Sequence, residues 1–461
     1  MSQAAPVEND DTTARAGEDP RPAEAPLLSV TGPPLFSRSE IAEIDRLLPY
    51  LSYVDGQLAV EGTPLTQLWS GPHPLLLYVP DRAVDNYQSI QRAFAPHFDL
   101  SINCAVKACY VGGVLTALRD VGAGVEVASE LEWRLARSLG FRPDQTVANG
   151  LGRTPAHLDR LLNEQGLLLD IDSESELEQI EWQAERLGAK PKIMVRVNPL
   201  PNDAFFSERS KLGLSSEEAQ LLLERVARSP HLELHGLHAH QLVRCTDPEQ
   251  FGLLTERMRE LRDAFTTAHS TGLRTLDLGG GIETRYLLER GGHTIEDFAD
   301  AAREALSGAS GLHIVLEPGR YVFGDAAVVV TGVMGTKRKA GHNWVIAGVG
   351  CNLLPPTSDR AYPTLPVVAD ESQAWERWHV ADPTPAPSRL YLDAILPSET
   401  IEDGLVLLGC GAYTAVRASL WSTDLPDIGF MSDGGVELVF DRAGQDAAFQ
   451  ALYGVDLISA D

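Results

Sequence analysis

The chain has 461 residues, of which 44% are hydrophobic, which is enough to bury more than one core. Its formal net charge of -27 argues against nucleic acid and anionic membranes as partners. No apolar run approaches the roughly 20 residues that a membrane span needs, and the amino terminus shows no basic region followed by an apolar one, so we expect no secretory signal. Five scattered cysteines without metal-type spacing favour reduced thiols in a cytoplasmic protein.

The first 74 residues are predicted to contain a disordered tail followed by a short segment with a helix and a hairpin. Residues 1–27 are rich in Ala, Pro, Glu and Asp and are expected to be a disordered tail. In residues 28–74 the apolar positions between Ile41 and Leu51 fit a helix. The stretch from Tyr53 to Val60 fits a hairpin that turns at Asp55-Gly56.

From Leu75 to about residue 322, strand-like segments alternate with amphipathic helices. LLLYV at 75–79 is predicted to be a buried strand, and eight more follow at 102–107, 125–129, 145–149, 167–171, 192–198, 232–240, 275–281 and 313–319. Helices are predicted between them, for example at 173–187, 216–229 and 247–271. This alternation is typical of a (β/α) barrel. Residues 323–461 show strands without long helices and are predicted to form an all-β domain.

Lys107 ends the apolar strand of one β-α-β unit, Ser101–Glu130. In an α/β barrel the carboxyl ends of the strands carry the chemistry. A lysine placed there among apolar residues is predicted to be partly desolvated, which would lower its pKa and free the amine as a nucleophile. Such an amine suits a Schiff base with an aldehyde cofactor. A lysine that reaches from the strand end into solvent is the alternative that this stretch alone leaves open.

The sequences AVKAC (105–109) and GAGVEVAS (122–129) resemble the fold-type III pyridoxal-phosphate (PLP) decarboxylases, which act on ornithine, arginine and diaminopimelate. The resemblance implies that Lys107 carries PLP, with Glu126 in place of the family's usual Asp. It also implies a TIM-like barrel of the alanine racemase type at 75–322 and a C-terminal β domain at 323–461. Residues 28–74 are expected to pack with that β domain.

Further motifs follow in the order that the resemblance requires. LDLGGGI contains Gly279, Gly280 and Gly281, and consecutive glycines let backbone N–H groups approach a phosphate. Three consecutive glycines alone are weak evidence for a phosphate site, but the resemblance implies that these residues bind the PLP phosphate. By the same resemblance, His240 stacks on the cofactor ring and Arg196 lies beneath it.

The segment Glu317-Pro318-Gly319-Arg320 supplies a carboxylate for the pyridine nitrogen. Such a carboxylate keeps the nitrogen protonated and makes the ring a stronger electron sink. The resemblance gives Glu317 this role and places Gly319 and Arg320 at the cofactor. It also implies a homodimer with shared active sites, in which the hydroxyl of Tyr413, from a Gly-Ala-Tyr motif, reaches the phosphate in the partner's barrel.

Three departures from the family pattern bear on the chemistry. Leu396 stands near the position of the family's proton-donating cysteine. Cys351 and Leu354 stand near the residues that recognise the distal end of the substrate, so the sequence does not predict recognition of a strongly charged distal end, as in ornithine, lysine or diaminopimelate. For the proton donor, Cys351 or a water molecule is preferred to Ser398 and Glu399, which lie close to Leu396 in the sequence. Leu242 and Val243 replace a Gly-Ser pair that contacts phosphate, and Arg244 is a possible substitute.

The sequence predicts a PLP-dependent decarboxylase acting on an amino acid or amino-acid derivative, free or carrier-linked. Because the usual donor is absent, a PLP-dependent racemase or epimerase remains an alternative. A non-catalytic relative that binds a partner is a third hypothesis, and the retained Lys107 and Glu317 argue against it. No metal site is predicted.

Overall fold

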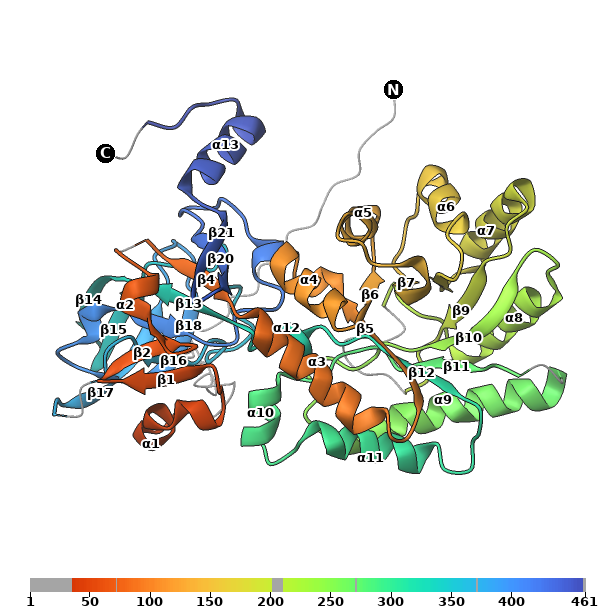
Figure 1. The fold of residues 1–461 in the computed structure, drawn as a ribbon, viewed down its shortest axis with the longest axis horizontal. Helices are drawn as coiled ribbons and strands as arrows, with labels where there is room; N and C mark the ends of the chain where they lie inside the picture. Colours follow the sequence, from red (N-terminus) through yellow and green to blue (C-terminus); the bar gives the residue numbers. More distant parts are fainter. Residues whose placement is uncertain (1–34, 72, 201–209, 270–271, 370–371, 459–461) are drawn as a thin grey trace, which may run out of the picture.

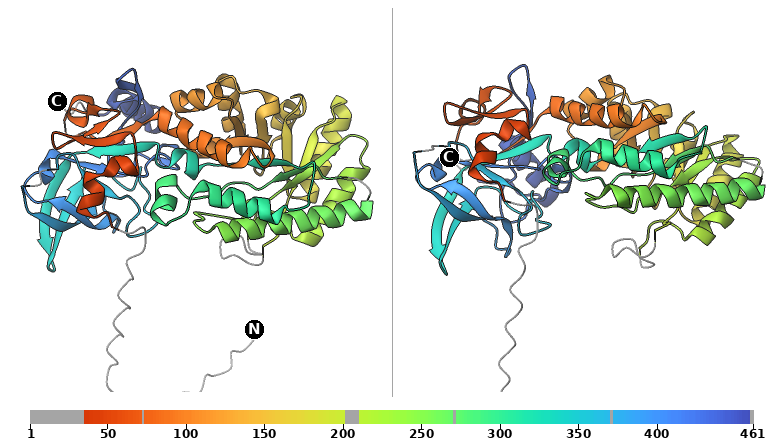
Figure 2. Two further views of the ribbon diagram at one scale, coloured as in Figure 1. Left: turned by 60° about the horizontal axis from the view of Figure 1, so that its bottom comes forward. Right: turned by 90° about the horizontal axis from the view of Figure 1, so that it is seen from below.

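A computed structural model describes residues 35–71, 73–200, 210–269, 272–369 and 372–458. It has a barrel at one end and a β-rich part at the other, as Figures 1 and 2 show from three sides. The tail predicted at residues 1–27 lies outside the described residues. Within the described part of the chain, no helix has both the length and the apolar character to cross a membrane.

Eight of the described strands close into a parallel barrel in which each strand pairs with the next along the chain and the last pairs with the first. They are β5 (Asp99–Ala105), β6 (Gly124–Val127), β7 (Thr146–Ala148), β8 (Leu168–Ile171), β9 (Lys192–Arg196), β10 (Glu233–His238), β11 (Thr275–Asp277) and β12 (His313–Leu316). This confirms the predicted (β/α) barrel. All eight carboxyl ends meet at one rim, where the predicted site residues follow the strands.

Helices surround the barrel on the outside (Figure 1). They are α3 (Pro80–Phe94), α4 (Gly112–Asp120), α5 (Glu130–Ser138), α6 (Pro155–Leu162), α7 (Glu174–Leu187), α8 (Ser216–Arg228), α9 (Pro248–His269), α10 (Arg285–Arg290), α11 (Ile295–Ala305) and the short α12 (Arg320–Phe323). Helix α7 shows why they form. The Ser173 side chain caps its first turn, Leu177, Ile180 and Ala184 bury one stripe, and Gly188 ends it in the left-handed conformation.

The β-rich part contains three sheets. The three-stranded sheet holds β1 (Leu51–Val54), β2 (Gln57–Val60) and β3 (Thr63–Pro64), which confirms the predicted hairpin at Asp55-Gly56. The six-stranded sheet runs in the order β16 (Thr364–Pro366), β19 (Leu405–Leu407), β13 (Ala327–Thr331), β4 (Leu75–Tyr78), β20 (Asp427–Ser432) and β21 (Gly435–Phe440). The four-stranded sheet runs β14 (Val333–Lys339), β15 (His342–Ala347), β17 (Trp375–Ala381) and β18 (Arg389–Pro397).

Strand β4 lies outside the barrel. It was predicted to open the barrel segment, but it pairs with β13 and β20 in the six-stranded sheet. A fully buried apolar run does not reveal its partner strands, so the sequence boundary at Leu75 falls one strand too early. Two further expectations need correction. The predicted helix between Ile41 and Leu51 is a short helix, α1 (Arg38–Ala42), followed by a 3-10 turn (Ile44–Arg46), and the predicted all-β part ends in a helix, α13 (Arg442–Tyr453).

A buried ion pair joins α3 to the start of the β-rich part. The Arg82 guanidinium donates to Asp325 Oδ2 at 2.9 Å, and the Asn86 amide donates to Asp325 Oδ1 at 2.6 Å. The Tyr50 hydroxyl donates to the Asp325 carbonyl oxygen at 2.8 Å. The side chains of Arg82 and Asp325 are 3% and 0% exposed. Asp325 therefore ties together the amino-terminal segment, the barrel and the six-stranded sheet.

We expect Asp325→Ala to lower the free energy of unfolding by about 3 kcal/mol, because it removes the buried partner of Arg82 and leaves only the half-exposed Asp85, 3.3 Å from Arg82 Nη1. Urea unfolding followed by circular dichroism measures this. Asp120→Ala, at a side chain that is 60% exposed, is the control and should change the value by less than about 0.5 kcal/mol. Equal effects of the two substitutions would contradict the role given to Asp325.

Candidate active site

Lys107 lies directly after β5, in a 3-10 turn (Val106–Ala108) at the carboxyl rim of the barrel. Its Nζ donates to Glu126 Oε2 at 2.6 Å. Glu126 comes from the neighbouring strand β6, where it pairs with Ala105. The Glu126 side chain is 0% exposed and that of Lys107 is 31% exposed, so the amine lies between a buried carboxylate and open space. The carboxylate of Glu126, which stands in place of the family's usual Asp, therefore lies beside the Lys107 amine.

The predicted lowering of the Lys107 pKa is wrong. Burial does lower the pKa of this amine, but the Glu126 and Glu317 carboxylates raise it by more, and the Lys107 pKa lies above its usual range. Burial, opposed by Lys107, raises the pKa of Glu126 to about 7. Lys107 therefore stands as a charged amine beside a carboxylate that can take up a proton near neutral pH.

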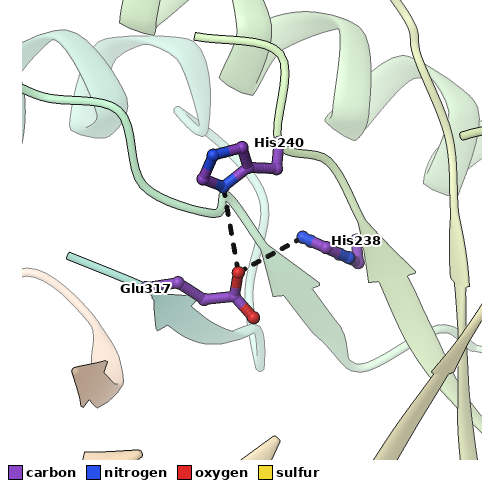
Figure 3. A group of neighbouring side chains, drawn as sticks. All are labelled: His238, His240 and Glu317. Atoms are coloured by element: carbon purple, nitrogen blue, oxygen red, sulfur yellow. Dashed lines mark ion pairs between the residues drawn. The ribbon is translucent and has the colours of Figure 1, made fainter. Parts of the chain in front are cut away.

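Glu317 follows β12 and points into the barrel mouth, where two histidines face it (Figure 3). Its Oε2 lies 3.5 Å from His238 Nε2 and 3.9 Å from His240 Nδ1. The Asn149 amide donates to Oε1 at 3.2 Å. Although burial alone would raise the pKa of Glu317, His238 and Lys107 hold it well below its usual range. Glu317 is a buried carboxylate that stays ionised.

His238, His240 and Glu317 also offer three ligand atoms within 4.8 Å of one another, a spacing compact enough for a metal ion. However, His240 Nδ1 accepts a hydrogen bond from the Gly280 N–H at 3.1 Å, so its lone pair is engaged. Burial, together with the charges of Lys107 and Arg196, lowers the pKa of His240 well below its usual value. His240 is therefore a neutral imidazole with a fixed tautomer, which suits a stacking surface.

The three glycines after β11 form a tight loop between His240 and Glu317. A Cβ on Gly280 would lie 2.2 Å from the Glu317 carbonyl oxygen, and one on Gly281 would lie 2.0 Å from the Leu242 carbonyl oxygen. Gly279 and Gly281 have φ values of +65° and +99°. No side chain fits at these positions. The Gly279 N–H donates to Asp277 Oδ1 at 2.8 Å and the Gly280 N–H to His240 Nδ1 at 3.1 Å, so two of the three loop N–H groups are engaged within the protein.

Tyr413, Gly319 and Arg320 meet on the side of the site nearest the β-rich part. The Tyr413 N–H donates to the Ala108 carbonyl oxygen at 2.9 Å, and the Arg320 guanidinium lies 5.3 Å from the centre of the Tyr413 ring. A Cβ on Gly319 would lie 2.6 Å from the Tyr413 hydroxyl oxygen. Tyr413 has a φ of +61°, which is uncommon for a tyrosine and indicates a constrained position.

Tyr413 therefore belongs to the site of its own chain. The prediction that it completes the partner's site is wrong, because the segment after β19 folds back onto the turn that carries Lys107. The sequence placed Tyr413 in a separate domain but could not show which barrel that domain faces.

Arg244 and Glu283 form a pair that no sequence motif indicates. Arg244 Nε donates to Glu283 Oε2 at 2.7 Å, and Arg320 Nε lies 3.8 Å from Glu283 Oε1. Next to this pair lies a cavity of about 520 Å³, lined also by Arg290, His293 and Ser358. The Arg244 guanidinium and the Glu283 carboxylate therefore lie together beside Arg320, at the edge of the site.

Cys351, the predicted proton donor, and Leu396, which stands near the family's cysteine position, have neighbours other than Lys107 and Glu317. The Cys351 thiol lies 3.5 Å from the Thr384 hydroxyl, and the Cys351 N–H donates to Asp382 Oδ2 at 2.9 Å. Between described residues, no hydrogen bond or ion pair joins Cys351 to Lys107 or Glu317. Leu396 is fully buried in β18, so it is a core residue. The role of Cys351 as proton donor stays a prediction.

The residues at the barrel mouth fit a cofactor that has an aldehyde, a ring nitrogen and a phosphate. Lys107 offers an amine, Glu317 a buried anion, and the glycine loop a backbone without side chains. Buried atoms without a hydrogen-bond partner in the described structure include Glu126 Oε1 and Arg196 Nε, both near this mouth. The fold and the site thus fit a barrel enzyme that uses a carbonyl cofactor.

Comparison with known proteins agrees with this class. The family model described as pyridoxal-dependent decarboxylase, pyridoxal binding domain, matches residues 81–324. The diaminopimelate decarboxylase of Aquifex aeolicus is 29% identical over 380 residues, which cover 80% of this chain and 89% of the relative. That of Pseudomonas aeruginosa is 29% identical over 382 residues, covering 81% and 91%.

Solved structures show the same architecture. One from Aquifex aeolicus has a TM-score of 0.77 and 26% identity and covers 89% of this chain and 100% of that chain. The diaminopimelate decarboxylase of M. jannaschii has a TM-score of 0.80 and 21% identity, covering 90% and 99%, and this likeness concerns the fold. The chain belongs to the pyridoxal-dependent decarboxylase family. It is a PLP-dependent carbon–carbon lyase of the amino-acid decarboxylase type, and the relatives do not favour the racemase alternative.

Proposed function

We propose that this enzyme removes the α-carboxylate of an amino acid with PLP held on Lys107 as a Schiff base. One observation carries the proposal. The Lys107 amine lies at the carboxyl rim of the barrel, 2.6 Å from Glu126, and Glu317 is close enough to raise its pKa as well. When bound, PLP supplies the electron sink into which the bond to the carboxylate releases its electrons.

The residues of the chain then have separate tasks. Lys107 would hold the cofactor through its amine, and Glu126 holds that amine and can take up a proton from it. Glu317 stays ionised and holds a proton at the ring nitrogen. His240 would offer the neutral face of its imidazole to the ring. Gly279–Gly281, Arg320 and the Tyr413 hydroxyl would hold the phosphate.

Diaminopimelate is the first substrate to test. Two relatives that cover most of the chain are diaminopimelate decarboxylases. Arg244, Glu283 and Arg320 place guanidinium groups and a carboxylate together at the edge of the site. A distal end that carries both an amino group and a carboxylate complements such a mixture. Lysine, ornithine, arginine and carrier-linked amino acids complete the panel.

We further propose a homodimer. The family resemblance implies two-fold assembly. Because Tyr413 lies at the site of its own chain, a site shared between two subunits would need a different residue from the partner. That residue could be the proton donor, since no cysteine stands near Leu396 in the sequence. Sedimentation of the PLP-loaded enzyme tests assembly, and full turnover by a dilute monomer would contradict sharing.

We expect Glu126→Gln to lower the pKa of the Lys107 amine, because the carboxylate that raises it is gone. More of the amine is then neutral at a given pH, so the apoenzyme should capture PLP faster, by about tenfold for each unit of pKa. Since the Glu126 pKa is raised to about 7, the difference should appear above pH 7, where the native carboxylate is ionised. Stopped-flow absorbance across pH measures it.

Glu126→Asp keeps the charge and is the matched control for this experiment. Its pH profile of PLP capture should follow that of the native enzyme more closely than the Glu126→Gln profile does. If the native and Glu126→Gln profiles coincide above pH 7, Glu126 does not set the protonation of Lys107.

A further inference from the structure

Three buried side chains, Asp170, His238 and Glu317, lie in a row inside the barrel. His238, at the end of β10, lies between Asp170 of β8 and Glu317, which follows β12. Its Nδ1 lies 2.7 Å from Asp170 Oδ2, and its Nε2 lies 3.5 Å from Glu317 Oε2. The side chains of His238 and Glu317 are 0% exposed and that of Asp170 is 3% exposed. Figure 3 shows the His238 ring edge-on to Glu317.

This geometry fixes the protonation of His238. Each ring nitrogen faces a carboxylate oxygen, and a nitrogen without a proton would direct its lone pair at a negative charge. Both nitrogens therefore carry protons, and His238 is an imidazolium. In agreement, Asp170 and Glu317 outweigh the effect of burial and raise the His238 pKa well above its usual value.

The positive charge of His238 keeps the Glu317 carboxylate ionised. An isolated carboxylate buried this deeply would take up a proton and could not hold one at a ring nitrogen. Asp277, the other buried carboxyl group beside this row, has a pKa raised by burial and by Glu317, and Gly279 N–H donates to its Oδ1 at 2.8 Å. The His238 cation is the charge that faces Glu317 from inside the barrel, whereas Lys107 lies on the substrate side.

We propose that Asp170 and His238 form a positioning pair that keeps Glu317 ionised and aimed at the cofactor's ring nitrogen. The pair acts through Glu317 and does not touch the substrate. This inference rests on the proposed role of Glu317. Asp170 holds the His238 ring by Nδ1, and His238 presents its Nε2–H to Glu317 from the side away from the cofactor. The Asn149 amide, 3.2 Å from Oε1, supports the same orientation.

The test is the protonation state of the ring nitrogen. The enzyme is loaded with PLP that carries an NMR-active nitrogen in the ring, and its chemical shift is recorded for the native enzyme, Asp170→Asn, His238→Gln and Glu317→Gln. Asp170→Asn keeps shape and removes charge, and His238→Gln keeps an amide donor and loses the cation. His235→Gln is the matched control, because His235 lies on the same strand but interacts with Glu233. Thermal unfolding and kcat are measured on the same samples.

We expect both variants of the pair to move the ring-nitrogen signal toward the unprotonated position and to lower kcat by roughly 10-fold or more, in line with outer-shell partners of metal ligands. His235→Gln should change neither. A lower unfolding temperature with an unmoved nitrogen signal would overturn the proposal and leave Asp170 and His238 as core residues. If Glu317→Gln also leaves the signal unmoved, the placement of Glu317 itself fails. If His238→Gln does not fold, Asp170→Asn decides the outcome.

Discussion

Replacing Lys107 by alanine should abolish decarboxylation, with a loss on the order of 10⁴-fold, the upper end of what a positioned proton-transfer group contributes. Lys107 is the amine at the barrel rim that lies against a buried carboxylate, and its removal takes away the group proposed to attach PLP. Borohydride reduction of the PLP-loaded native enzyme, followed by peptide mapping, should place the label on Lys107.

Lys211→Ala is the control for this substitution, because Lys211 is exposed. It should keep both the label and the activity. A label on another lysine, or turnover by Lys107→Ala close to the native rate, would show that Lys107 does not carry the cofactor.

Glu317→Gln should retain PLP but slow the reaction by about 10²–10³-fold, the usual cost of removing one preorganised electrostatic contact. The amide is nearly isosteric but neutral, so the ring nitrogen loses its anionic partner and the ring becomes a weaker electron sink. The expected signature is a fall in kcat with little change in the affinity for PLP, measured by equilibrium titration and steady-state kinetics.

Glu176→Gln is the comparison for Glu317→Gln. Glu176 is a partly buried carboxylate in α7 that pairs with Arg153 and not with Glu317. It should leave kcat within a few-fold of the native value. Near-native turnover by Glu317→Gln would mean that Glu317 does not serve the ring nitrogen.

The fold could be predicted from the sequence to a large extent, because strands and helices of a barrel follow one another in the chain. The eight barrel strands all lie where the alternation indicated them. Strand β4 could not be assigned, since its partners β13 and β20 lie more than 200 residues further along the chain. Helix α13 was missed because its Gly444 and small residues give a weak apolar stripe.

The motifs located the site residues, but their electrostatics depend on neighbours from other strands. The apolar residues around Lys107 pointed to a lowered pKa, whereas Glu126 and Glu317 raise it. The Asp170–His238 contact joins residues 68 positions apart, and no local pattern indicates it. His238, the first histidine of the Gly-Leu-His-Ala-His segment, was the one sequence feature that could have indicated this contact, because it lies two residues before the predicted His240 and is buried in β10.

Release of carbon dioxide from a carboxyl-labelled amino acid tests the central claim most directly. The PLP-loaded enzyme is incubated with diaminopimelate and with the rest of the panel, and carbon dioxide and amine product are both quantified. We predict equal amounts of the two from at least one substrate, and neither without PLP or with Lys107→Ala. A substrate that is racemised without loss of carbon dioxide, or release that is unchanged in Lys107→Ala, would contradict the proposed function.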